Sequence, residues 1–345
     1  MRKMNVLLAG LIGLSILVSG CASPTAAPGT GVSQAGGADK YAGLTVKLGV
    51  QGSSGMFRKA RDAGWFEDAF GKLGVKVEWA EFQSGPPMTE AMASNRLDFA
   101  GLGNMPVIAA QAADIKFSII SQALEGTNNV AIIVPKGSAI QSIDQLKGKK
   151  VAVAKGSNAF NFLYRGLEQA GLKASELEII QLQPDEAQPA FEAGKVDAWA
   201  TWDPSITLNT LTGKATVLAD GAKLGVLSPS FYIVRQQFAD KYPELVTLYL
   251  KVLEQTRVWE AEHTKEAYEK YAGENKAPAA LIEAIYKRSP NVNIPVTKEV
   301  IAELQKTADF QYSIQNIRKQ VDVSKIVHNQ YLEEALKQAA QEPKK

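Results

Sequence analysis

The stretch VAVAKGSNAFNFLYRGLEQAGL, residues 151–172, decides the fold class of this 345-residue chain. It opens with an alternating β-type run at 151–154 and changes to apolar residues at helical spacing between Phe160 and Leu167. The Lys-Gly-Ser-Asn sequence at 155–158 predicts a tight turn that leads into a helix. The free N–H groups and the positive dipole end of such a helix attract anions.

A second copy of this pattern lies about a hundred residues earlier in the chain. The sequence LGVQGSS at 48–54 matches the start of the stretch above, and residues 78–92 match residues 178–191. NRLDFAGLGNMP at 95–106 matches GKVDAWATWDP at 194–204. Repeated elements in the same order predict two related α/β lobes.

The matched loops predict a binding cleft. In open α/β sheets, ligands bind beyond the carboxyl ends of the strands, so two lobes that face each other would line one cleft with these loops. The loops are residues 51–54, which contain Gln51, and residues 83–87, 102–104, 155–158 and 201–203.

Polar residues in these loops are the first candidates for ligand contacts. Ser157 and Asn158 can act as helix caps without any ligand, but Ser53, Ser54 and Asn104 occupy the equivalent ends in the other lobe. This convergence favours a ligand-facing role.

The Trp202-Asp203-Pro204 turn has two interpretations. It can be structural, with Trp202 in the core, Asp203 as a cap and Pro204 at the first position of a helix. Alternatively, Trp202 presents an apolar wall to a ligand, and Asp203 accepts hydrogen bonds or orients a neighbouring cation. A carboxylate that faces an anion would be repulsive unless it is paired.

The N-terminus predicts export and lipidation. Residues 1–21 combine a basic start, a short apolar run and small residues before Cys21, the only cysteine of the chain. This arrangement resembles a bacterial lipoprotein signal peptide in which Cys21 carries the lipid, although an ordinary secretory signal with an incidental cysteine is the alternative. Residues 22–39 are rich in Ala, Pro, Gly, Ser and Thr and predict a flexible tether.

Composition excludes several function classes. The net charge is only +2 and the body has no basic run, so nucleic-acid binding is not expected. The sequence has no motif of a metal enzyme, a serine or cysteine hydrolase or a phosphate-binding loop, and His263 and His328 are expected to face solvent. We therefore predict no metal, no cofactor, no catalytic residues and no enzymatic activity.

Two β-type runs, at 129–134 and 228–238, predict the crossings between the lobes. The first lobe is accordingly predicted at residues 40–134 plus 230–345, and the second at 135–229. Helical patterns begin at Pro243 and run to about Tyr271, then resume at Pro278 and at Val296. We expect these helices to pack on the first sheet and to contribute little to ligand chemistry.

Several motifs, spread from Leu48 to Val323, also resemble the solute-binding proteins of aliphatic-sulfonate ABC importers. They are EFQSGPPMTEAM, DFAGLGNMPVIAAQAA, DQLKGKKVAVAKGS, LYRGLEQAGL, QPDEAQPAFEAGKVDAWATWDP, VTKEVIAELQKTADF and QVDV. The resemblance implies a bilobed type II periplasmic-binding-protein fold, with two α/β lobes joined by a two-strand hinge. It places the sulfonate-binding loops on Ser53, Ser54, Gly103, Asn104, Ser157, Asn158, Trp202 and Asp203. Asp often stands in the family pattern where this chain has Asn104.

Together these features predict an extracytoplasmic, lipid-anchored monomer that captures small alkanesulfonates by hinge closure. The ligand would pass to an ABC permease and its ATPase. The wider family also binds taurine, nitrate and thiamine precursors, and the ammonium of taurine would give Asp203 a partner. A related fold serves a pyrimidine-forming enzyme that uses histidine and cysteine, but the predicted cleft loops contain neither.

Overall fold

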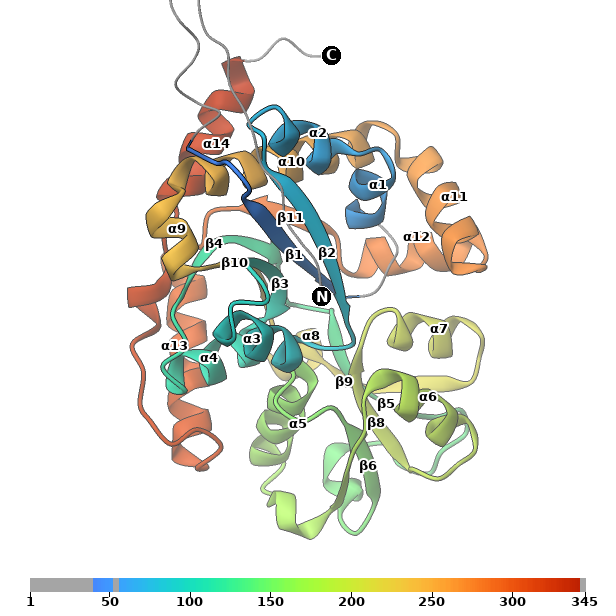
Figure 1. Cartoon of the computed structure of the whole chain (residues 1–345). Helices are drawn as coiled ribbons and strands as arrows, with labels where there is room; N and C mark the ends of the chain where they lie inside the picture. Colours follow the sequence, from blue (N-terminus) through green and yellow to red (C-terminus); the bar gives the residue numbers. More distant parts are fainter. Residues whose placement is uncertain (1–39, 52–55, 342–345) are drawn as a thin grey trace, which may run out of the picture.

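The computed structural model describes residues 40–51 and 56–341 (Figure 1). The predicted signal peptide with Cys21, the tether, Ser53 and Ser54 lie outside these residues. The described part of the chain contains two sheets, one of six strands and one of five, and helices pack against both. The lobe that is built on the five-stranded sheet lies below the other lobe in Figure 1.

The six-stranded sheet has the order β11-β4-β10-β3-β1-β2. Its strands are β1 (Thr45–Gln51), β2 (Lys76–Phe82), β3 (Phe99–Gly103), β4 (Phe117–Leu124), β10 (Ser230–Arg235) and β11 (Asn291–Ile294). The five-stranded sheet has the order β7-β6-β8-β5-β9. Its strands are β5 (Val130–Pro135), β6 (Lys150–Val153), β7 (Glu178–Gln181), β8 (Ala198–Trp202) and β9 (Ala215–Asp220).

The two sheets share one topology. In the first, β1 pairs in parallel with β2 and β3, and the antiparallel strands β10 and β4 continue the sheet. In the second, β6 pairs in parallel with β7 and β8, and the antiparallel strands β5 and β9 follow. The strands correspond one to one, with β11 as an additional edge strand. The internal sequence repeat predicts the match of β1, β2 and β3 with β6, β7 and β8, whereas the matching antiparallel strands lie outside the repeat.

Helices cover both faces of each sheet. In the first lobe they are α1 (Met56–Asp62), α2 (Trp65–Gly71), α3 (Gly85–Ala93), α4 (Asn104–Ala112), α9 (Gln236–Lys241), α10 (Pro243–Glu262), α11 (Thr264–Asn275), α12 (Ala279–Arg288), α13 (Lys298–Ser313) and α14 (Gln330–Gln341). In the second lobe they are α5 (Asn158–Gln169), α6 (Pro184–Glu192), α7 (Ser205–Leu211) and α8 (Gly221–Leu224). None of the helices in the described ranges is long and apolar enough to span a bilayer.

Each lobe has its own hydrophobic core. In the second lobe, Val130, Ile132 and Val134 of β5 pack with α5 on one face, while Ala131 and Ile133 pack with α6 and α7 on the other. The continuous apolar run of this strand is therefore explained by burial on both faces. The apolar clusters of the first lobe contain no residue of the second.

The crossings between the lobes lie at residues 125–129 and 226–229. The predicted boundary at residue 134 differs from this arrangement, because β5 pairs with β8 and β9 of the second sheet. Two hydrogen bonds join the crossings. Ser228 N donates to Gly126 O at 2.8 Å, and Asn129 Nδ2 donates to Ser228 O at 2.8 Å. Gly126 has φ +98°, and a Cβ there would lie 2.3 Å from Pro229 N, so this position requires glycine.

The helical segment predicted from Pro243 to Tyr271 is two helices, α10 and α11. They meet at His263, whose φ of −122° is not helical. This break sends α11 and α12 away from the face of the first sheet and toward the space between the lobes (Figure 1).

Candidate functional site

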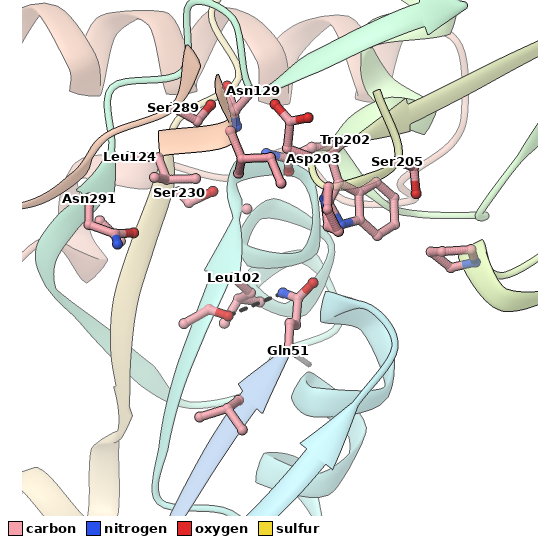
Figure 2. Close-up of a pocket in the computed structure, with 18 of the residues that line it drawn as sticks. Gln51, Leu102, Leu124, Asn129, Trp202, Asp203, Ser205, Ser230, Ser289 and Asn291 are labelled. Carbon is pink, nitrogen blue, oxygen red and sulfur yellow. Dashed lines mark hydrogen bonds between the residues drawn. The ribbon is translucent and has the colours of Figure 1, made fainter. Parts of the chain in front are cut away.

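A cavity of about 610 Å³ lies between the lobes. Figure 2 shows Gln51 and Leu102 of the first lobe on one side and Trp202 and Asp203 of the second lobe on another. Each loop predicted to line a cleft contributes at least one residue to this cavity. Examples are Gln51, Gln83, Leu102, Ser157 and Trp202.

Four helices of nine or more residues begin at this cavity. Gly85 of α3, Asn158 of α5 and Pro184 of α6 line it, and so does Gly103, which precedes α4. The first turn of a helix carries a partial positive charge and N–H groups that no carbonyl of the helix accepts. In α4 the N–H groups of Asn104 and Met105 are already bonded to Pro229 O and Asn158 Oδ1, and prolines in the first turns of α3, α4 and α6 have no N–H. The positive ends of four helix dipoles from both lobes still meet at this end of the cavity, which makes it favourable for an anion.

Charged side chains are scarce around the cavity. Among the described residues that line it, Asp203 is the only acid, and no lysine, arginine or histidine is present. No group of His, Cys, Asp and Glu in the described ranges has an arrangement that could hold a metal ion. An anion here would be held by dipoles and neutral donors.

Ser157 is bonded as a helix cap. Its Oγ donates to Ala154 O at 2.7 Å and accepts from Phe160 N at 3.2 Å. The hydroxyl thus completes the turn between β6 and α5, as the structural interpretation expects. Its role as a ligand contact stays a prediction.

Asn158 connects the two lobes. Its Oδ1 accepts from Met105 N of α4 at 3.2 Å, and its Nδ2 donates to Ser228 O in the second crossing at 3.2 Å. Both ends of the amide are therefore engaged by protein. A ligand contact from this residue would come from its backbone N–H at the start of α5 or require the amide to turn.

Gly103 makes this bridge possible. A Cβ at Gly103 would lie 1.9 Å from Asn158 Oδ1, so only glycine allows the asparagine to reach the start of α4. Asn104, the next residue, is 1 % exposed and does not line the cavity. Its backbone N donates to Pro229 O at 2.9 Å, whereas neither polar atom of its side chain has a hydrogen-bond partner.

Gln51 lies at the end of β1 and lines the cavity. Its Nε2 donates to Gly101 O of β3 at 3.2 Å, which fixes the amide along the neighbouring strand (Figure 2). Ser53 and Ser54, which follow it in the chain, lie outside the described residues.

Trp202 and Asp203 both line the cavity from the end of β8. Trp202 is half-buried and packs on the core of the second lobe, so it supplies both core contact and cavity wall. Asp203 Oδ1 accepts from Thr207 N at 2.9 Å and from Thr207 Oγ1 at 2.6 Å, which caps α7. Burial raises the pKa of the Asp203 carboxyl, although Thr207 and Arg288 oppose that rise.

Arg288, the last residue of α12, pairs with two acids of the second lobe. Its Nε lies 3.4 Å from Asp203 Oδ2, and its Nη2 lies 3.7 Å from Asp220 Oδ2. Sequence patterns do not indicate this residue, because it lies 85 positions from Asp203 in a segment without cleft motifs.

An apolar and aromatic wall closes the other side of the cavity. Tyr271 of α11, Leu281, Ile285 and Tyr286 of α12, and Tyr232 of β10 line it. Burial raises the pKa of Tyr232, so its hydroxyl stays protonated. The expectation that the C-terminal helices contribute little to the ligand site was wrong, since the break at His263 brings α11 and α12 to the cavity.

Comparison with known proteins places the chain in a family. The family model described as NMT1/THI5 like matches residues 54–267, more than half of the chain. The chain belongs to the NMT1/THI5-like family. This NMT1/THI5-like chain is also 40 % identical, over 95 % of its length and 96 % of the relative, to a Bacillus subtilis protein named as an aliphatic sulfonates-binding protein.

Two solved structures resemble this NMT1/THI5-like protein. The alkanesulfonate-binding protein SsuA from Xanthomonas axonopodis pv. citri, bound to MOPS, is 30 % identical with a TM-score of 0.77, and the match covers 83 % of this chain and 99 % of that chain. The periplasmic aliphatic sulphonate binding protein SsuA from Escherichia coli is 31 % identical with a TM-score of 0.72, over 82 % and 97 %. The resemblance to sulfonate-binding proteins and the predicted bilobed binding-protein fold are thus confirmed.

Proposed function

We propose that this protein is the extracytoplasmic substrate-binding protein of an ABC importer for alkanesulfonates. It captures the ligand between its lobes and delivers it, as a monomer, to a permease driven by an ATPase. The convergence of four helix N-termini on a cavity without cationic side chains in its described lining carries the proposal.

The cavity suits both parts of an organosulfonate. The sulfonate has three acceptor oxygens and one delocalised negative charge, which the helix dipoles and those backbone N–H groups that are not already bonded can hold without a countercharge. The organic tail would lie against Trp202, Leu281 and Tyr286, where apolar burial stabilises it. The MOPS bound by the relative from Xanthomonas is itself an organosulfonate.

Other ligands of the wider family fit less well. Taurine carries an ammonium, and the one acid of the described lining, Asp203, is already paired with Arg288. Nitrate and sulfate would leave the apolar wall in contact with water. A neutral pyrimidine has no negative charge to interact with the positive ends of the helix dipoles.

The test is a thermal-unfolding scan of the purified protein against methane-, ethane-, butane- and octanesulfonate, taurine, sulfate, nitrate and an aminopyrimidine. A ligand at a hundred times its dissociation constant adds about 2.7 kcal/mol to the free energy of unfolding. We expect midpoint shifts of several degrees with the alkanesulfonates. A shift with taurine, nitrate or the pyrimidine alone would overturn the substrate class, and turnover of any ligand would overturn the proposal that the protein is not an enzyme.

Lipidation at Cys21 would hold the protein on the extracytoplasmic face of the membrane. We expect Cys21→Ala to move the protein from the membrane fraction to the soluble fraction, because the lipid that would anchor the protein is attached to this cysteine. Ser23→Ala, two residues away, serves as the control and should stay with the membrane. Retention of the Cys21→Ala protein in the membrane would contradict the anchor.

A further inference from the structure

The ion pairs of Arg288 join the two lobes beside the ligand cavity. Arg288 belongs to the first lobe, whereas Asp203 and Asp220 belong to the second. The Asp203 side chain is 6 % exposed and that of Arg288 is 22 % exposed, so this pair is largely shielded from water. Asp203 lines the cavity and Arg288 does not, so Asp203 is the member of the pair that a bound ligand would meet.

We propose that Arg288 determines which sulfonates this protein accepts, by neutralising Asp203 and so excluding ligands whose tail carries an ammonium. The inference rests on the proposed function and adds a selectivity residue to it. Arg288 acts through Asp203 rather than by touching the ligand.

Charge balance explains the selection. Without Arg288, the Asp203 carboxylate would be a buried anion with only the two hydrogen bonds from Thr207. A ligand ammonium would then supply the missing counterion. With Arg288 in place, the Asp203 carboxylate has a cationic partner at 3.4 Å, although the same guanidinium also lies 3.7 Å from the more exposed Asp220. The attraction of Asp203 for a ligand ammonium is therefore reduced, and an apolar tail is preferred.

The test compares two ligands that differ in one group. Taurine and propane-1-sulfonate have the same number of non-hydrogen atoms, and an ammonium in one replaces the terminal methyl of the other. Isothermal titration of the purified full chain gives the ratio of their dissociation constants. A ratio cancels effects on folding or closure that both ligands share.

We expect the wild-type protein to prefer propane-1-sulfonate. Arg288→Gln should shift the ratio of the dissociation constants toward taurine by about tenfold or more, because the shielded Asp203 carboxylate loses its cationic partner. Asp203→Asn should shift the ratio in the opposite direction, since the Arg288 charge is then less compensated. Adding Asp203→Asn to Arg288→Gln should abolish the gain in taurine affinity. These opposite shifts distinguish selectivity from general damage to the site.

Lys287→Gln is the matched control, because Lys287 precedes Arg288 on the same helix, is 71 % exposed and pairs with Glu283 at 2.6 Å. It removes the same charge and should leave the ratio unchanged.

If propane-1-sulfonate binds the wild type and the Arg288→Gln ratio equals that of Lys287→Gln, the inference is overturned while the proposed function stands. If the wild type binds neither sulfonate, both are overturned. Should Arg288→Gln fail to fold, an unchanged ratio in Asp203→Asn would overturn the inference.

Discussion

Asn158 has a position that its sequence context predicts only in part. The Gly-Ser-Asn turn predicts a residue at the mouth of a cleft, and Asn158 lines the cavity. Its partners, Met105 and Ser228, come from distant parts of the chain, and the turn carries no information about them. A local motif fixes where a side chain starts, whereas the packing of the lobes decides what it bonds.

The contact between Gly103 and Asn158 gives a residue-scale prediction. We expect Gly103→Ala to lower the free energy of unfolding by about 1–3 kcal/mol and to weaken sulfonate binding, because the added methyl would lie 1.9 Å from Asn158 Oδ1. Urea unfolding and calorimetric titration measure the two effects. Gly273→Ala in α11 is the control, since its Cβ would meet no atom within 4 Å. Equal stability of the two variants would contradict this account of Gly103.

At the scale of elements, α5 contacts the first lobe along one stripe. Asn158, Asn161 and Arg165 lie three and four residues apart and so share a helix face. Asn161 Oδ1 accepts from Gln311 Nε2 of α13 at 2.8 Å, and the Arg165 guanidinium lies 5.2 Å from the ring centre of Phe310. The contacts between the lobes on this side are therefore polar, in contrast to the apolar cores within each lobe.

We expect Asn161 and Gln311 to be energetically coupled, because both are fully buried and bond across the lobes. A double-mutant cycle with Asn161→Ala and Gln311→Ala should give a coupling of about 0.5–1.5 kcal/mol by urea unfolding. The exposed pair Glu334 and Gln338 within α14, bonded at 2.7 Å, should give at most about 0.5 kcal/mol. A buried coupling no larger than the exposed one would show that this contact does not hold the lobes.

The repeat between residues 48–106 and 151–204 is why the sequence alone predicts the two α/β lobes and the loops between them. It contains the three parallel strands and the cleft loops of each lobe, and these strands occupy equivalent places in the two sheets. The wall formed by α11 and α12 could not be predicted in the same way, because these helices have no counterpart in the second lobe. Their pattern of apolar residues indicates a buried face, but the residue that changes their direction, His263, has no distinguishing local signal.

For the whole molecule, separate cores and two crossings allow the lobes to move as bodies. No described apolar cluster spans both lobes, and the bridges beside the cavity are polar or ionic. Water can replace these polar partners when the lobes separate, so the net free energy lost for each contact is small. A bound ligand can therefore shift the population between open and closed arrangements by the contacts that it makes in only one of them.

Closure on the ligand is the prediction for the whole molecule. Residues 40–345 contain no cysteine, so Leu211→Cys on α7 and Ala280→Cys on α12 give a unique pair of spin labels on opposite lobes. We expect double electron–electron resonance to show a shorter and narrower distance distribution with an alkanesulfonate than without it, because the ligand bridges both lobes. Leu211→Cys with Lys195→Cys, both in the second lobe, should give one distribution in either condition. An interlobe distance that the ligand leaves unchanged, while calorimetry shows binding, would mean that the protein binds its ligand without hinge closure.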